Sequence, residues 1–287
     1  MAVRPSPTVR RRRLRYELRR LRSERGLTIE QVQERSGGDI KAPSISRWEN
    51  GERSVRPTDL RLLLDIYEVQ GEPRETLLTL SRQAKERGWW QSYASAIPEW
   101  FQVYVGLEAE AARIHEYAAE LVPGLLQTPD YYRAFLRTAP AVGEDEAERK
   151  IEVRLARQER LTADDPPEYW AVLNEAVIRR VVGGAEAMRA QLGHIAEMAE
   201  RPHVNVQVLP FGAGVHPAMD GGFSVLGFPE AADPDVVYLE NQAGSLYLEE
   251  EAEIDRYARM FSHLIAKARD PEESRRMIAR LAADLTG

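Results

Sequence analysis

The sequence contains no cysteine and no long apolar run. The missing cysteines exclude disulfides, thiolate zinc sites and cysteine nucleophiles. No apolar stretch approaches the roughly 20 residues that a membrane-spanning helix needs. Met1 is followed by arginines rather than by the apolar core of a signal peptide, so none is expected. We therefore expect a cytoplasmic protein that makes no contact with a membrane.

Sequence patterns of common enzymes and metal sites are also missing. There is no P-loop, and no GxGxxG opens a helix after a strand. The five histidines form neither an HxxxH nor an HExxH pair: His115, His194, His203, His216 and His263. We expect no enzyme, no bound metal and no cofactor.

The chain is long enough for two domains of ordinary size, and its charge is divided between them. The whole sequence of 287 residues has a net charge of −7. Residues 1–88 hold 20 Lys and Arg against 13 Asp and Glu, whereas the remainder holds 19 basic and 33 acidic residues. The basic part is attracted to phosphate and the acidic part is repelled by it. This asymmetry predicts that the N-terminal part faces nucleic acid.

Residues 27–51 have the pattern of two short helices joined by a turn, the unit that places a helix in the DNA major groove. Thr28 and Gln31 form a capping box at the start of the first helix. The second helix is expected to begin at about Pro43, whose fixed φ suits a first turn, and to end at Gly51. The sequence thus predicts double-stranded DNA as a partner.

The outward positions of the second helix carry small or hydrogen-bond-donating side chains. Such side chains donate to guanine or contact a thymine methyl group, so the expected base-reading residues are Lys41, Ala42, Pro43, Ser44 and Arg47. Donors around the two helices suit the DNA backbone. The expected phosphate contacts are Thr28, Asn50, Arg53, Arg56, Arg10, Arg11, Arg12 and Arg13.

The arginine run 10–13 has two interpretations. It could follow a DNA groove as an N-terminal arm, or it could be the solvated first turn of a helix. Four consecutive cations at a helix start oppose the helix dipole, which favours the role in DNA binding.

The sequence ISRWENG, followed by Arg53, Arg56 and a helix led by Pro57, resembles the Xre/Cro-type helix-turn-helix of phage repressors and bacterial regulators. The resemblance implies an all-α five-helix DNA-binding domain over residues 9–72, with DNA contacts at the positions named above. One departure is about two extra residues between the two helices, within residues 38–40, compared with the usual short turn.

Later segments resemble a C-terminal domain of unknown biochemical function that follows Xre-type domains in actinobacterial regulators. These segments are WWQSYASAIPEWFQVYVGLEAEA, VPGLLQTPDYYRA and NVQVLPFGAG. In such regulators the gene often neighbours one for a small partner protein. The resemblance therefore implies an antitoxin-like regulator with a small protein as a further partner.

Outside the DNA-binding domain, we expect a disordered segment over 1–8, a connecting helix over 73–88 and a mixed α/β or α+β domain over 89–287. The expected strands are 111–122, 168–178, 203–211, 222–228 and 236–241. One expected helix begins at Thr128-Pro129. The other expected helices are 143–161, 184–200, 249–268 and 271–285.

Two aromatic features have more than one interpretation. Six aromatic residues lie between Trp89 and Tyr104, where they either fill a core, which is favoured, or line an interface. With the helix at 131–136, this cluster is the expected dimer seam. Trp48 could stack on a ligand, but its helical phase with Ile45 favours the core.

A glycine-rich loop between two expected strands is a candidate ligand site, because backbone N–H groups can hold an anion. Its candidate residues are Gly212, Gly214, His216 and Asp220. The alternative is a flexible connection without a ligand. His216, Asp220 and Glu240 are the only group with the character of acid–base catalysts, provided that they lie close together.

The expected function is that of a sequence-specific transcriptional regulator that binds DNA as a homodimer. Its acidic C-terminal domain would hold the dimer and bind a small partner protein or ligand. The alternative is an antitoxin-type interaction module that regulates its own operon, and a third hypothesis is an enzyme fused to a DNA-binding domain.

Overall fold

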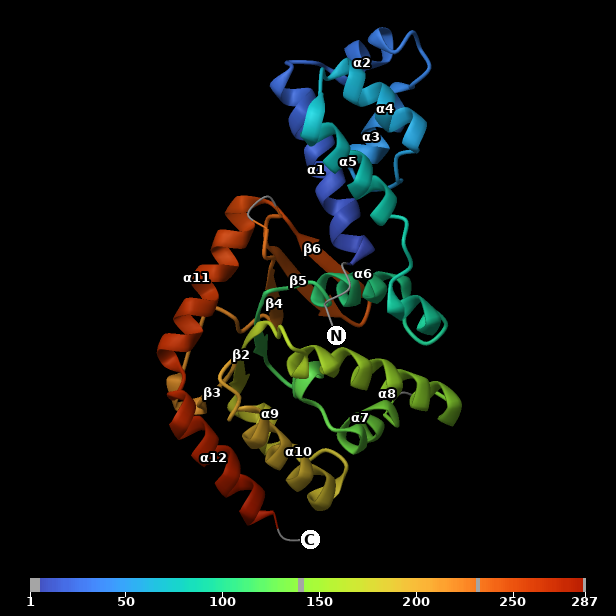
Figure 1. Ribbon diagram of the computed structural model, residues 1–287. Coiled ribbons are helices and arrows are strands. Elements are labelled where there is room, and N and C mark those ends of the chain that lie inside the picture. The colour runs from blue at the N-terminus through green and yellow to red at the C-terminus, as the bar shows by residue number, and fades with distance from the viewer. Residues whose placement is uncertain (1–5, 139–141, 231–232, 286–287) are drawn as a thin grey trace. The chain divides into compact units, whose positions relative to one another are not determined.

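The computed structural model describes residues 6–138, 142–230 and 233–285 (Figure 1). The chain divides into two compact units, of which the N-terminal unit ends at Gln91 and the C-terminal unit begins at Ser92. None of the helices in the described ranges is long and apolar enough to cross a membrane.

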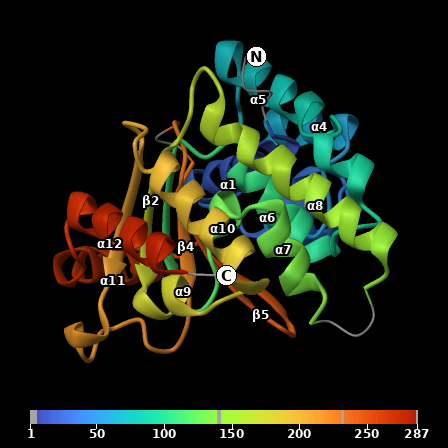
Figure 2. The ribbon, with the colours of Figure 1, turned by 90° about the horizontal axis from the view of Figure 1, so that it is seen from below.

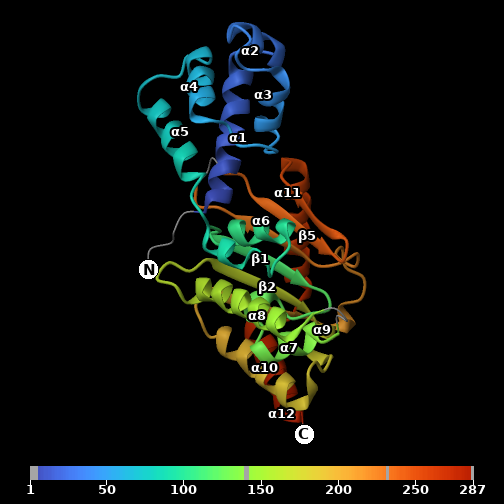
Figure 3. The same ribbon diagram turned by 90° about the vertical axis from the view of Figure 1, so that its right-hand side faces the viewer.

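The N-terminal unit consists of helices around one apolar core (Figure 3). Leucines at helical spacing on three helices, together with Ile45 and Trp48, fill this core. Trp48 is 7% exposed, which confirms its structural interpretation. The helices are α1 (Pro7–Glu24), α2 (Ile29–Arg35), α3 (Ala42–Glu49), α4 (Pro57–Ile66) and α5 (Gly71–Gln83), followed by a 3₁₀ turn at Trp89–Tyr93.

Two expectations about the limits of this unit need correction. Helix α1 begins at Pro7, because the Ser6 hydroxyl accepts the N–H of Thr8 and proline suits the first turn. The expected disorder is therefore wrong for residues 6–8, while residues 1–5 lie outside the described residues. The helix that was expected to connect the two domains is α5. It belongs to the core of the N-terminal unit instead, because it packs on α1 and α4 with Leu77 and Leu80 in that core.

The C-terminal unit contains a six-stranded mixed sheet and helices, as expected for an α/β or α+β domain. The strand order is β3-β2-β1-β4-β5-β6, with β1, β2 and β3 parallel and the other pairings antiparallel. The strands are β1 (Arg113–Ala118), β2 (Glu168–Asn174), β3 (Val204–Leu209), β4 (Phe223–Gly227), β5 (Val236–Asn241) and β6 (Gly244–Leu248). The α-helices are α6 (Glu99–Glu108), α7 (Pro129–Leu136), α8 (Glu144–Gln158), α9 (Glu175–Arg179), α10 (Gly184–Met198), α11 (Glu251–Lys267) and α12 (Pro271–Asp284).

The sequence patterns located five of these strands, with two differences in detail. The expected strand 168–178 ends at Asn174, because the Asn174 side chain accepts the N–H of Ala176 and caps α9. Strand β6 was not expected, since it begins with a glycine and none of its five residues is buried.

Each face of the sheet is covered by different helices (Figure 2). Phe261 and Leu264 of α11 pack on one face, together with Tyr117 and Phe223 of the strands. On the other face Tyr104 of α6 lies against Tyr238 of β5, with ring centroids 4.2 Å apart. Of the six aromatic residues from Trp89 to Tyr104, Trp90 and Tyr104 are buried at 4% and 3% exposure, whereas Trp89 is 37% exposed and the other three are partly exposed. The core interpretation therefore holds for two of the six.

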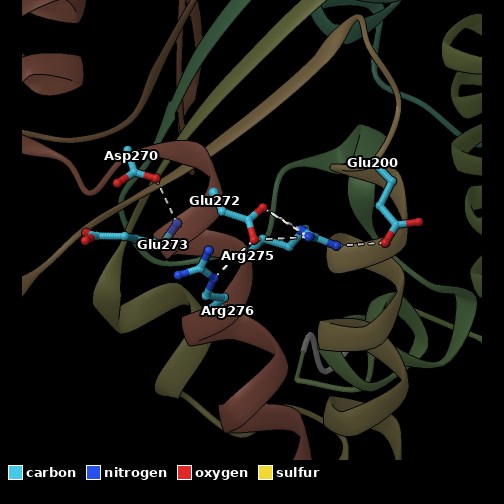
Figure 4. A network of polar contacts seen from close by, with 6 residues as sticks. All are labelled: Glu200, Asp270, Glu272, Glu273, Arg275 and Arg276. Carbon is cyan, nitrogen blue, oxygen red and sulfur yellow. Dashed lines mark hydrogen bonds and ion pairs between the residues drawn. The ribbon is translucent and has the colours of Figure 1, made fainter.

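Helix α12 closes the β3 edge of the sheet. The Arg269 N–H donates to the Val208 carbonyl, and the Val208 N–H donates to the Ser274 hydroxyl. At the start of α12, Asp270 accepts the N–H of Glu273 as an N-cap, and Arg275 contacts both Glu272 and Glu200 (Figure 4). The Arg275–Glu200 pair ties α12 to the segment after α10.

On the face of the sheet that α6 covers, strand β1 carries a partly buried carboxylate. The Glu116 carboxylate of β1 accepts a hydrogen bond from the Tyr169 hydroxyl at 2.9 Å. Burial raises the pKa of Glu116 from 4.5 to about 7, against the opposing effects of the Tyr169 hydrogen bond and of Arg157 and Arg154. Glu116 is therefore half-protonated near neutral pH.

We expect Glu116→Gln to stabilise the C-terminal unit at pH 8–9 and to change its stability little at pH 4–5. Because the pKa is higher in the folded than in the unfolded chain, the stability that protonated Glu116 contributes is present below pH 4.5 and is lost as pH rises through about 7. Glutamine resembles the protonated acid, so the gain at alkaline pH should approach about 3 kcal/mol at most. Urea unfolding of both proteins across this pH range measures it, and a gain independent of pH would contradict the assignment.

Candidate nucleic-acid interface

Helices α2 and α3 are joined by a turn that their own side chains hold in place. The Thr28 hydroxyl accepts the N–H of Gln31, and the Gln31 side chain accepts the N–H of Thr28, which confirms the capping box. In the turn, Gly37 and Gly38 have φ values of +65° and +84°, which favour glycine. This pair accommodates the extra length of the connection.

The start of α3 is fixed by a residue of α2. Gln33 Oε1 accepts the N–H of Ala42 at 2.8 Å and so satisfies a free donor of the first turn of α3. The buried Ser36 hydroxyl accepts the N–H of Ile40 and donates to the Gln33 carbonyl. These bonds set the direction in which α3 leaves the turn.

The two sides of α3 differ in composition. Ile45, Trp48 and Glu49 are buried against the rest of the unit. The expected base-reading residues lie on the other side or at the start of the helix: Lys41, Pro43 and Arg47 are exposed, and Ala42 and Ser44 are partly exposed. Residues 41 to 44 thus lie at the start of α3, and Arg47 is exposed about one turn further along the helix.

An ion pair anchors the other end of α3 to α1. The Arg22 guanidinium donates from Nε and from its second terminal nitrogen to the two Glu49 oxygens, both at 2.7 Å. Its remaining terminal nitrogen donates to the Leu27 carbonyl at 2.8 Å. The Glu49 side chain is 5% exposed, and its hydrogen bonds raise the pKa of Arg22. A bidentate pair of this kind fixes both distance and orientation.

The expected phosphate contacts after α3 are all at the surface. Asn50 caps α3, Arg53 follows it with its N–H donating to the Arg47 carbonyl, and Arg56 caps α4. All three are exposed. Thr28 is exposed as well, although its hydroxyl oxygen and its N–H already serve the capping box.

The arginine run 10–13 lies within α1, so the extended arm is wrong. Four consecutive helical residues point in different directions around the axis, and their environments differ accordingly. Arg12 is buried, Arg10 and Arg13 are partly exposed, and Arg11 donates from Nε to the Ala84 carbonyl of the N-terminal unit. The run is therefore not a single phosphate-binding surface.

Arg22, Glu49 and Gln33 were not among the expected site residues. Charged residues within apolar helix positions indicate burial with a partner, but sequence spacing does not show that residues 22 and 49 meet. The signal for Gln33 is weaker still, since glutamine is common on exposed helix positions.

In the C-terminal unit, several N–H groups of the glycine-rich loop are already used in hydrogen bonds. The N–H groups of Phe211, Ala213 and Gly214 already donate to Glu175, Pro210 and Phe211, respectively. Lys267 Nζ donates to the carbonyls of Ala213 and Val215. Of the four candidate ligand residues, Gly212, Gly214 and Asp220 are exposed and His216 is partly exposed.

His216 and Glu240 lie on opposite faces of the sheet. His216 Nε2 is 3.4 Å from the Tyr117 hydroxyl on the face covered by α11, and burial lowers the pKa of His216. Glu240 accepts from the Tyr238 hydroxyl, whose ring packs on Tyr104 of α6. The acid–base group of His216, Asp220 and Glu240 is therefore not assembled. Among the described residues, no three His, Cys, Asp or Glu side chains are arranged to hold a metal ion.

Comparisons with known proteins agree with the division of the chain. Residues 13–77 match the family model of a helix-turn-helix domain. Residues 101–280 match the family model of a domain of unknown function, DUF5753. Searches of curated proteins and of solved structures gave no match. The matched domain spans more than half of the sequence, and the chain therefore belongs to the DUF5753 family, with a helix-turn-helix domain at its N-terminus.

Proposed function

We propose that this protein is a sequence-specific transcriptional regulator of the Xre/Cro type, of the kind found in actinobacteria, and that it acts in the cytoplasm. One observation supports this most directly: α3 presents Lys41, Ser44 and Arg47 outwards while both of its ends are fixed from inside the unit. A fixed helix with donors on its free face is what major-groove recognition requires. Catalysis is not part of the proposal.

Variants of Arg47 and Arg53 should affect DNA binding differently. Arg47→Ala should relax the base preference, at about 1–3 kcal/mol for one lost bidentate contact to guanine. Arg53→Ala should weaken binding to all sequences about equally, because a phosphate contact carries no base information. Selection from a randomised DNA pool followed by sequencing measures both effects. An unchanged base preference in Arg47→Ala would place base recognition elsewhere.

We further propose that the C-terminal unit holds a homodimer. Single domains of this type make few base contacts, so dimers reading two half-sites are the usual solution. The N-terminal unit is basic, and its leucines are used in its own core. In the C-terminal unit Val103, Phe135 and Leu155 are exposed apolar side chains, with Phe135 on the α7 helix of the expected seam.

Sedimentation of two fragments tests this assignment. The fragment from Ser92 to Gly287 should sediment as a dimer, and the fragment ending at Gln91 should sediment as a monomer. A dimeric N-terminal fragment beside a monomeric C-terminal one would refute it.

The antitoxin-type alternative is favoured by the loop after β3. Phe211, Val215 and Met219 are 60%, 79% and 66% exposed, an unusual concentration of apolar side chains in one loop. A small protein encoded by a neighbouring gene would be its partner. Co-expression followed by purification of Phe211→Ser and wild-type chains tests this, since only the wild type should retain the partner.

A further inference from the structure

A small cavity in the N-terminal unit is surrounded by cations. Its volume is about 40 Å³, and it lies between α1, the segment that follows α3, and α5. A water molecule needs about 10–15 Å³ of such space, so the cavity has room for a small polar group. Four of its lining residues are basic, namely Arg11, Arg15, Arg53 and Lys85, and no carboxylate lines it.

The cations come from three different elements and are partly held in place. Arg11 Nε donates to the Ala84 carbonyl at 3.0 Å, which leaves its two terminal nitrogens for another acceptor. The Arg15 guanidinium lies against Gly51, where a Cβ atom would stand 3.0 Å from it. Arg53 and Lys85 form no ion pair with any residue that the structure describes.

A buried hydroxyl adds an uncharged donor. Ser81 of α5 is 4% exposed and lines the cavity. A serine hydroxyl can donate one hydrogen bond to an acceptor placed in the cavity. Leu14, Trp48 and Val55 complete the wall as apolar surface, which strengthens electrostatic interactions within the cavity.

We propose that this cavity binds a phosphate group. A phosphate monoester carries about two negative charges and three strong acceptor oxygens at neutral pH. A carboxylate offers only two oxygens. Phosphate therefore fits a site with several cationic donors and one hydroxyl better than a carboxylate does. Arginine forks and lysine ammonium groups are the usual phosphate ligands in proteins. The phosphate could belong to a small molecule or to the DNA backbone, and the second source rests on the proposed function.

Occupancy of the cavity would also affect the recognition helix. The segment after α3 contributes Gly51, Arg53 and Val55 to the wall. Since the Arg53 N–H donates to the Arg47 carbonyl at 3.2 Å, a phosphate bound to Arg53 restrains the last turn of α3. The site thereby links phosphate binding to the element expected to read DNA.

The first arm of the test uses the full chain without DNA. Thermal unfolding is measured in potassium phosphate and in potassium chloride of equal ionic strength at pH 7.5. The melting temperature of the N-terminal unit should be higher in phosphate than in chloride, and the difference should saturate as the phosphate concentration rises. Any ligand that binds only the folded state has this effect. Lys85→Gln and Ser81→Ala should raise the half-saturating concentration, by about tenfold for the lysine. Arg82→Gln, the same charge change on α5 away from the cavity, is the matched control and should behave as wild type.

The second arm measures binding to a DNA duplex of arbitrary sequence as a function of salt. If the phosphate is that of the backbone, Lys85→Gln lowers the salt slope by about one per protomer and Arg82→Gln does not. A saturable effect in the first arm identifies a free phosphate ligand, and an effect confined to the second identifies backbone phosphate. Lys85→Gln and Ser81→Ala behaving like Arg82→Gln in both arms would overturn the proposal. If the wild type binds no DNA, the proposed function is wrong, and the first arm still decides whether the cavity binds phosphate.

Discussion

Arg157→Ala is expected to destabilise the C-terminal unit by about 3–5 kcal/mol, because it leaves the buried Glu108 carboxylate without its partner. The Arg157 guanidinium donates twice to Glu108, both times at 2.7 Å, and the two side chains are only 5% and 2% exposed. The pair joins α8 to α6, and the guanidinium also lies 5.0 Å from the centre of the Phe101 ring. Urea unfolding of the full chain, with separate transitions fitted for the two units, measures the loss.

Arg149→Ala provides the matched control, since Arg149 is an exposed residue of the same helix. It should change the free energy of unfolding by no more than about 0.5 kcal/mol. The double variant Arg157→Met, Glu108→Leu should recover much of the stability, because replacing both charges leaves none uncompensated. A loss below about 1 kcal/mol in Arg157→Ala would contradict the assignment of a buried ion pair that joins α6 and α8.

DNA affinity should fall by roughly three to five decades between 50 and 200 mM salt, if a dimer neutralises about 6–10 phosphates. The expectation follows from the excess of basic residues in 1–88 and from the exposure of Lys41, Arg47, Arg53 and Arg56 around α3. Each neutralised phosphate releases counterions, so affinity depends on a high power of the salt concentration. Fluorescence anisotropy of a labelled duplex over a potassium chloride series measures the slope.

Two variants separate this effect from the net charge of the protein. Arg56→Gln should lower the slope by about one per protomer, whereas Arg149→Gln in the acidic unit should leave it unchanged. Affinity that varied little with salt would contradict an electrostatic interface on the N-terminal unit.

Local chemistry explains why the helix-turn-helix could be located before any coordinates. The Thr28–Gln31 capping box, Pro43 in the first turn of α3 and Gly51 after its end act over a few residues, so the sequence alone reveals them. The same holds for Thr128 at the start of α7, whose side chain caps the helix as its residue type predicts. Strand β6 was not predicted because its residues are weakly buried on both faces, so its apolar and polar side chains do not alternate in a detectable pattern.

The arginine run shows where sequence reasoning about the interface ended. Four adjacent cations predict attraction to phosphate, but a helix distributes them around its axis, and only packing decided that Arg12 is buried and that Arg11 faces Ala84. Helix α5 is a similar case. Its leucine spacing predicts an apolar face without naming the surface that the face contacts, which proved to be α1 and α4.

Composition and local patterns thus determined that the chain has a basic helical part with a helix-turn-helix and an acidic part with strands and helices. These properties depend on residue type and on spacings of two to four positions. Contacts between residues distant in the sequence were decided by the tertiary structure alone. They are the ion pairs of Arg22 with Glu49 and of Arg157 with Glu108, and the cavity that Arg11, Arg53 and Lys85 line. Sequence periodicity does not predict such contacts. They result from the packing of helices and strands whose relative positions are fixed only when the whole core has formed.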